Sequence, residues 1–115
     1  METTYKESAP TRADIDALAG PAVLEFGTNW CGYCRAAQPP LAQAYAAYEQ
    51  VPHYKVEDGP GRLLGRSFRV KLWPTLIFLR DGKELARVVR PESADEIRVG
   101  FAAIIPASSA AGDQA

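Results

Sequence analysis

Short apolar segments alternate with helix-like segments along most of this 115-residue chain. Strands are predicted at residues 22–27, 53–57, 75–80 and 84–89, and helices at 11–20, 32–50, 62–68 and after Ser93. Alternating strands and helices imply parallel pairing through crossovers, while the Asp81–Gly82 turn favours an antiparallel hairpin. We therefore expect an α/β fold with a central mixed sheet of four to five strands flanked by helices on both faces, and TYKES at 4–8 is the candidate fifth strand.

Two prolines interrupt the longest predicted helix. The segment RAAQPPLAQAYAAYEQ is rich in alanine and carries Leu41, Tyr45 and Tyr48 at helical spacing. Proline has no N–H to donate and its ring clashes with the preceding turn. We therefore expect Pro39 and Pro40 to kink this helix or to split off its first turn.

Length, charge and hydropathy narrow the classes of function. We expect one domain at residues 1–105 and a disordered tail at 106–115, where the sequence is small and polar. A net charge of −1 without a basic block argues against nucleic acid, and no apolar run reaches the ~20 residues that span a bilayer. The start, METTYKESAPTRAD, lacks the basic and apolar parts of a secretory signal. We expect a cytoplasmic monomer without a membrane partner.

The two cysteines are separated by Gly32 and Tyr33 at a predicted strand-to-helix junction. Cys31 is expected at the helix N-terminus, where free backbone N–H groups and the helix dipole favour a thiolate and thiol pKa values fall to roughly 3.5–7.5. Cys34 is expected to be more buried and within reach of Cys31. It can therefore resolve a mixed disulfide that Cys31 forms.

Three other interpretations of the cysteine pair compete with this one. A zinc ion needs four ligands, and the chain adds only His53 to the two cysteines. A metal shared between subunits, or an iron–sulfur cluster completed by glutathione, would need ligands from outside the chain. A structural disulfide over so short a loop would stabilise little. The pattern therefore favours a redox-active pair.

An acidic residue interrupts an otherwise apolar strand. Glu25 lies within AVLEFG, and a buried carboxylate is costly unless it is paired or protonated. We expect Glu25 to lie behind the cysteines with a raised pKa and to move protons, with Lys55 of the neighbouring strand as its partner. The alternative for Glu25 is that it faces solvent on a strand buried on one side only. The alternative for Lys55 is an ordinary exposed strand lysine. Spacing alone does not show whether the Trp73–Pro74 bond is cis.

These residues together resemble the thioredoxin family. WCGYC is similar to the family's WCGPC, AVLEFGTNWCGYCRAAQP to its strand, active site and kinked helix, and WPTLIFLRDGKELARVV to its cis-proline, hairpin and last strands. The resemblance covers roughly residues 11–105. It implies that Cys31 is the nucleophile and Cys34 the resolving thiol, with Glu25 as the buried acid and Lys55 as its partner. It also implies a cis Pro74 beside the cysteines.

The sequence departs from the family pattern at several positions. Tyr33 replaces a proline, which points to a less reducing couple than that of thioredoxin. Gly27 stands where thioredoxins carry a Trp and Trp73 where they carry a smaller residue, so we expect bulk to have moved from one wall of the groove to the other. Arg90–Pro91 replaces a glycine-containing loop. The residues expected to contact substrate are Trp30, Gly32, Tyr33, Trp73, Pro74 and Arg90.

The predicted function is reduction of protein disulfides by dithiol exchange through Cys31 and Cys34, assisted by Glu25 and Lys55. It needs no bound cofactor and no metal, and a separate reductase or glutathione would supply the electrons. One alternative is a non-catalytic module of this fold that binds a partner or senses redox state. Another is a glutathione-linked reductase of the glutaredoxin kind, although the Gly-Gly that helps to bind glutathione is missing after the hairpin.

Overall fold

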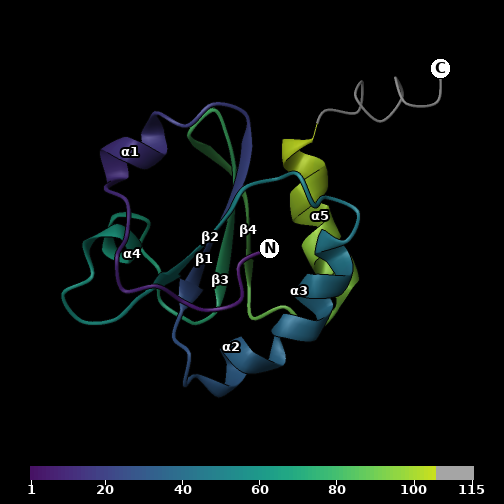
Figure 1. Ribbon diagram of the computed structural model, residues 1–115, viewed down its shortest axis with the longest axis horizontal. Helices are drawn as coiled ribbons and strands as arrows, with labels where there is room; N and C mark the ends of the chain where they lie inside the picture. The colour runs from purple at the N-terminus through teal and green to yellow at the C-terminus, as the bar shows by residue number, and fades with distance from the viewer. Residues whose placement is uncertain (106–115) are drawn as a thin grey trace.

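The computed structural model describes residues 1–105, so the predicted tail at 106–115 lies outside the described residues. Its elements are α1 (Arg12–Asp16), β1 (Pro21–Gly27), α2 (Gly32–Ala36), α3 (Gln38–Tyr45), β2 (His53–Glu57), α4 (Leu63–Ser67), β3 (Thr75–Arg80), β4 (Lys83–Val89) and α5 (Ala94–Ile104). Figure 1 shows these elements along the chain. None of the helices among the described residues is long and apolar enough to cross a membrane.

The strands form one mixed sheet in the order β2-β1-β3-β4. β1 pairs in parallel with β2 and antiparallel with β3, and β3 pairs antiparallel with β4. The register places Glu25 directly beside Lys55. The candidate fifth strand at 4–8 makes only a single bridge, between Lys6 and Val56, so the described sheet has four strands.

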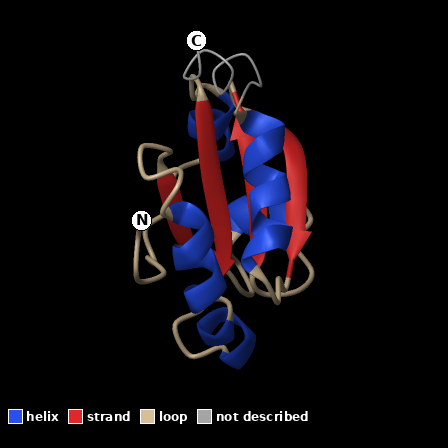
Figure 2. Cartoon of the chain, turned by 90° about the vertical axis from the view of Figure 1, so that its right-hand side faces the viewer, coloured by secondary structure: helices blue, strands red, loops and turns tan. Residues whose placement is uncertain are grey.

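Helices cover both faces of the sheet, as the alternation of elements predicts (Figures 1 and 2). α3 and α5 pack on one face and α1 and α4 on the other. Neighbouring residues of β1 point to opposite faces, so Val23 joins the first core and Leu24 the second. Leu76 and Ile77 of β3 divide in the same way. The central strands are therefore buried on both sides.

The long helix predicted at 32–50 is two shorter helices. α2 ends at Ala36, and α3 begins at Gln38 and ends at Tyr45, about five residues earlier than predicted. Pro39 and Pro40 occupy the first turn of α3, where a missing N–H costs little. They cannot donate to the last turn of α2, so the helix divides before them. The predicted split is confirmed, and the predicted end at about residue 50 is wrong.

Two local features allow a tight hairpin turn and close packing of a helix on the sheet. Asp81 and Gly82 have φ values of 52° and 78°, the left-handed conformation that a tight hairpin needs, so the predicted turn is confirmed. Gly100 lies inside α5, where a Cβ would come within 2.2 Å of the Phe78 ring. The glycine therefore lets α5 approach β3 closely, which accounts for a residue of low helix propensity at this position.

Candidate active site

Both cysteines lie where β1 gives way to α2, and both are free thiols. Cys31 caps the N-terminus of α2, and its Sγ accepts a hydrogen bond from the backbone N–H of Cys34 at 3.3 Å. Cys31 is 8% exposed and Cys34 is fully buried, so the predicted difference in burial is confirmed. A partner can therefore reach Cys31 first.

Burial changes the acidity of the second thiol. Loss of solvation raises the pKa of Cys34 to about 12, and the hydrogen bond and charge of Cys31 act in the same direction. Hydrogen bonds from the Thr28 backbone and the Tyr5 hydroxyl oppose the rise without cancelling it. Cys34 of the reduced protein therefore keeps its proton at neutral pH.

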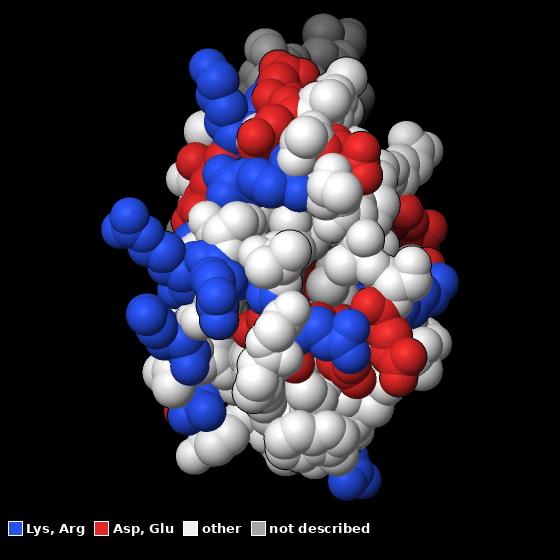
Figure 3. Space-filling model, turned by 90° about the vertical axis from the view of Figure 1, so that its left-hand side faces the viewer, with Lys and Arg blue, Asp and Glu red and all other residues white. Residues whose placement is uncertain are grey.

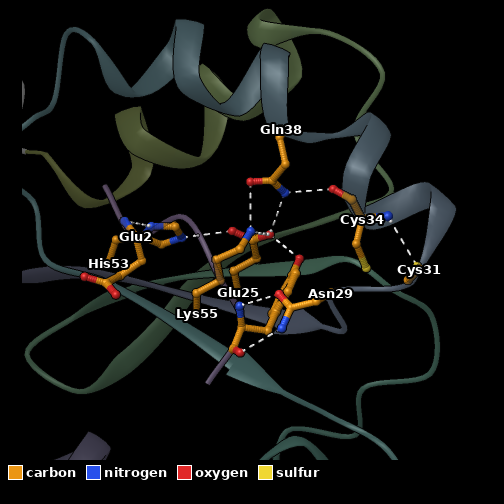
Figure 4. Close-up of polar contacts among 9 residues, drawn as sticks. Glu2, Glu25, Asn29, Cys31, Cys34, Gln38, His53 and Lys55 are labelled. Carbon is orange, nitrogen blue, oxygen red and sulfur yellow. Dashed lines mark hydrogen bonds and ion pairs between the residues drawn. The ribbon is translucent and has the colours of Figure 1, made fainter. Parts of the chain in front are cut away.

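The carboxylate of Glu25 lies at the centre of a buried polar network, shown in Figure 4. Its Oε1 pairs with Nε2 of His53 at 2.9 Å, and its Oε2 accepts from Nζ of Lys55 at 2.8 Å. The same Oε2 accepts from Nε2 of Gln38 at 3.2 Å and from the hydroxyl of Tyr5. Lys55 is also buried and donates to Oε1 of Gln38 at 2.8 Å. The expected pairing of Glu25 with Lys55 is confirmed.

These contacts reverse the expected acidity of Glu25. Burial by itself would raise its pKa, but the hydrogen bond from His53 and the ammonium group of Lys55 outweigh this effect and lower the pKa to about 2. The prediction of a raised pKa is therefore wrong. It rested on burial alone, whereas this carboxylate is surrounded by donors. Glu25 is a stable buried anion at neutral pH.

The hydrogen bonds of His53 identify its tautomer. The backbone N–H of Glu2 donates to Nδ1 of His53 at 3.0 Å, so this nitrogen carries no proton. The proton therefore lies on Nε2, which donates it to Glu25. His53 serves as a donor to the carboxylate and is joined to the N-terminal segment on its other side.

The N-terminal segment forms part of the site. The backbone N–H of Tyr5 donates to Oδ1 of Asn29 at 2.8 Å, and Nδ2 of Asn29 donates back to the Tyr5 carbonyl at 3.2 Å. This reciprocal pair joins the segment to the loop that precedes Cys31. The ring of Tyr5 is buried with Cys31 and Cys34, and Nζ of Lys55 lies 4.0 Å from its centre. Burial and the charge of Glu25 raise the pKa of the Tyr5 hydroxyl, which remains protonated.

Gly27 makes room for this ring. A Cβ at Gly27 would lie 2.5 Å from Sγ of Cys34 and 2.7 Å from the Tyr5 hydroxyl. The space beside Gly27 is therefore filled by Tyr5, twenty-two positions earlier in the chain, which the expected shift of bulk to the Trp73 wall did not include. Because both atoms adjoin the same small volume, the Tyr5 hydroxyl and the Cys34 thiol are neighbours.

Aromatic side chains surround the exposed side of the cysteines. Trp30 and Tyr33 are 73% and 60% exposed. Trp30 meets the ring of Trp73 edge to face at 5.9 Å, and the guanidinium of Arg90 lies 3.8 Å above the ring of Tyr33. Arg90 also donates from Nε to the Trp73 carbonyl at 2.8 Å. We call these four residues the aromatic rim.

The remaining predicted site residues lie beside the rim. The Trp73–Pro74 peptide bond is cis, and Pro74 is buried. Gly32 opens α2 and is exposed, and a Cβ added to it would meet nothing within 4 Å. All ten predicted residues therefore belong to the buried network, to the cysteine pair or to the rim and its neighbours.

Four residues of the network were missed by the sequence analysis as site residues: Tyr5, Asn29, Gln38 and His53. Two of them had a usable signal. His53 precedes Lys55 by two positions in β2, so both side chains point to the same face, and Gln38 follows Cys34 by four positions, about one helical turn. Tyr5 and Asn29 are joined across 24 positions, and no local pattern predicts that contact. Among residues 1–105, no three His, Cys, Asp or Glu side chains gather closely enough to hold a metal ion.

Three comparisons with known proteins agree on one family. The thioredoxin family model matches residues 3–103. The solved structure of thioredoxin 2 from Pseudomonas aeruginosa PAO1 in its reduced form is 61% identical, with a TM-score of 0.79 over 88% of this chain and 94% of that chain. Thioredoxin-2 of Saccharomyces cerevisiae is 33% identical over 77% of this chain and 86% of its own length.

Other curated relatives align over a shorter stretch. Thioredoxin H-type 1 of Nicotiana tabacum is 36% identical over 67 residues, which is 58% of this chain and 53% of that protein. The chain thus spans about half the length of several curated thioredoxins that it matches. The family match nevertheless covers almost all of residues 1–105 and includes the network, the cysteines and the rim. The chain belongs to the thioredoxin family.

Proposed function

We propose that this protein is a thiol–disulfide oxidoreductase that reduces disulfide bonds of other proteins. One observation carries the proposal: two free thiols lie three positions apart, the first slightly exposed and the second fully buried, with the backbone N–H of the second donating to the sulfur of the first. An accessible sulfur followed by a buried one suits sequential attack and resolution. Membership of the thioredoxin family supports the same function.

In the first step, Sγ of Cys31 attacks one sulfur of a substrate disulfide. The new bond joins Cys31 to the substrate, the substrate's S–S bond breaks, and its other sulfur leaves with the electron pair. The attacking species is a thiolate, and the Cys34 N–H that donates to Sγ of Cys31 interacts more strongly with a thiolate than with a neutral thiol.

In the second step, Cys34 attacks Sγ of Cys31 and releases the bound substrate sulfur. The Cys34 proton ends on the departing thiol, so each reduced disulfide yields two thiols and one Cys31–Cys34 disulfide. We propose that the Tyr5 hydroxyl accepts the Cys34 proton while its own proton shifts to Glu25, and that the reverse shift then delivers a proton through Tyr5 to the departing substrate sulfur. With its pKa lowered to about 2, Glu25 holds that proton only while the sulfurs exchange partners.

Substrate would bind in an extended form against the aromatic rim and Pro74. The exposed rings of Trp30 and Tyr33 offer apolar contact area beside Cys31. Electrons would return from a separate reductase or from glutathione, and a reducing compartment such as the cytoplasm would suit this cycle. No bound cofactor takes part in either step.

Mixed-disulfide trapping tests the proposal. The Cys34→Ser variant should accumulate a covalent complex with a disulfide peptide, because Cys31 can attack and nothing resolves the product. The Cys31→Ser variant is the matched control and should form none. Mass spectrometry of the acid-quenched mixture reads both outcomes. Equal trapping by the two variants, or none by either, would remove the dithiol mechanism.

The Tyr5→Phe variant tests the proton path. It keeps the ring beside Gly27 and removes only the hydroxyl. Rapid-quench kinetics should show unchanged formation of the mixed disulfide and resolution that is about tenfold slower, in the range typical of lost proton-transfer assistance. Tyr48→Phe is the control, since that hydroxyl has no contact with the cysteines. Slowing of both steps alike would assign Tyr5 a packing role instead.

A further inference from the structure

A cleft of about 540 Å³ lies between the start of α4 and the segment that leads to Trp73. Basic side chains dominate its walls: Arg62, Arg66, Arg69 and Lys71 line it, together with a single acid, Asp58. Figure 3 shows several Lys and Arg side chains gathered along one flank of the face that carries α1 and α4. The chain as a whole has a net charge of −1, so this concentration of positive charge is local.

Most of that charge is not neutralised within the protein. Arg62 pairs with Glu57, and the Asp58 carboxylate accepts a hydrogen bond from the indole N–H of Trp73 at 2.9 Å. Arg66, Arg69 and Lys71 are exposed, and none of them forms an ion pair with the residues that the structure describes. Three cationic side chains therefore face the same cleft without an internal partner.

The backbone at Arg69 adds to this observation. Arg69 follows the C-terminus of α4 with φ of 57°, a left-handed conformation that favours glycine at such a position. An arginine accepts the same conformation at a cost in strain. Its guanidinium adds a charge to the cleft that a glycine would not supply.

Trp73 connects the cleft to the cysteines. On one side its ring packs against the cluster of Tyr5, Cys31 and Cys34, and on the other side it lines the cleft. Lys71 precedes it by two positions. A substrate segment that binds at Cys31 and extends past Trp73 therefore enters the basic cleft directly.

We propose that this cleft binds acidic side chains of the disulfide-bearing protein, a few residues from the cysteine that Cys31 attacks. The proposal rests on the proposed function and adds the chemistry of the partner. Charge complementarity carries it, because three cations without an internal partner line a cleft that shares Trp73 with the cysteine cluster. Such charges at the edge of a binding surface mainly raise the rate of association with a partner of opposite charge.

The test uses two synthetic peptide disulfides as the probe. Each is a symmetrical dimer joined through one cysteine, with glutamates placed several positions from it in one peptide and glutamines at the same positions in the other. The measured quantity is the second-order rate constant with the reduced wild-type protein, by rapid quench. Each value is divided by the rate constant with dithiothreitol, because nearby carboxylates alter the reactivity of the disulfide itself.

The wild-type protein should react about five- to tenfold faster with the glutamate peptide after this correction, and added salt should reduce the preference. Arg66→Gln/Lys71→Gln should lower the preference to about twofold and leave the glutamine peptide unaffected. The matched control is Lys83→Gln/Arg98→Gln, which removes the same charge from residues that do not line the cleft and should keep the preference.

The outcomes separate the two proposals. Failure to reduce either peptide would remove the proposed function. Reduction of both at equal corrected rates, or equal loss of preference in the cleft variant and the control variant, would overturn the cleft proposal alone. Loss of the preference in millimolar inorganic phosphate at constant ionic strength would support the proposal, because phosphate would compete with the glutamates for the same cations.

Discussion

The buried network and the aromatic rim both adjoin the cysteine pair but differ in burial and in the kind of contact that holds them. In the network, each polar atom of Glu25 has a partner, and Glu25 and Lys55 are excluded from solvent. In the rim, Trp30 and Tyr33 are largely exposed and are held by one edge-to-face contact and one cation–π contact. The network is thus part of the folded core, whereas the rim is a surface.

The network and the rim should therefore respond differently to substitution. A buried, fully paired network responds strongly to any change, since a lost partner leaves a charge in a low-dielectric interior. A solvated rim tolerates change, because water replaces lost contacts. We therefore expect substitutions in the network to alter stability and sulfur chemistry, and substitutions in the rim to alter which partners react.

Breaking the buried ion pair should give the largest effect. Lys55→Met leaves the Glu25 carboxylate without its ammonium partner and should lower the free energy of unfolding by about 3 kcal/mol. Urea denaturation measures this value. Lys71→Met, at an exposed lysine, is the control and should change it by less than about 0.5 kcal/mol. The double variant Glu25→Leu/Lys55→Met should regain part of the loss; a larger loss in the double variant would contradict the pairing argument.

Low pH should have the next largest effect on stability, because it protonates Glu25 of the network. The folded pKa of Glu25 is about 2, below its ordinary value of 4.5, so this group contributes stability that is fully present above about pH 4.5 and is lost as the pH falls through 2. The contribution is about 3 kcal/mol at neutral pH. Urea denaturation across this range should show a steeper decline for the wild type than for Glu25→Gln. Parallel curves for the two proteins would show that Glu25 is not the group responsible.

Crowding the cysteines should have an intermediate effect. Gly27→Ala would place a Cβ 2.5 Å from Sγ of Cys34, and such overpacking should cost about 2 kcal/mol. Gly32→Ala is the matched control, because nothing lies within 4 Å of the added carbon, and it should change stability by less than about 0.5 kcal/mol. Thermal and urea unfolding compare the two. Similar values for both variants would mean that Tyr5 yields without cost.

The rim should give the smallest effect. Arg90→Ala removes the contact with Tyr33 and the hydrogen bond to the Trp73 carbonyl, and it should lower the free energy of unfolding by about 1 kcal/mol or less. A double-mutant cycle with Tyr33→Ala should return a coupling of about 0.5 kcal/mol. A cost comparable with that of Lys55→Met would erase the distinction between rim and network.

Sequence patterns predicted most of the fold because the information is local. Strand runs, the Asp81–Gly82 turn and the prolines at 39 and 40 act on their immediate neighbours, and the order of elements then restricts the topology. The spacing of Cys31 and Cys34 likewise predicted their place at the start of a helix. The errors concern extent: the second helix stops at Tyr45, and the segment at 4–8 makes only one bridge.

The missing part of the site depends on contacts between distant segments. Glu25 was recognised as an anomaly within an apolar strand, but its acidity depends on donors that belong to three other segments. Burial argues for a raised pKa and the donors argue for a lowered one, and only the structure decides between them. Tyr5 illustrates the same limit, because nothing near it in the sequence links it to the cysteines.

The attachment of Tyr5 to Asn29 has a practical consequence for engineering the protein. A shortened version that starts at Thr11 would keep the sequence of all nine described helices and strands. It would nevertheless lack the ring that shields Cys34, so water and oxidants could reach the thiol from behind. Affinity tags are therefore better placed away from the first six residues, and shelf-life against air oxidation is a sensitive measure of whether that segment is seated.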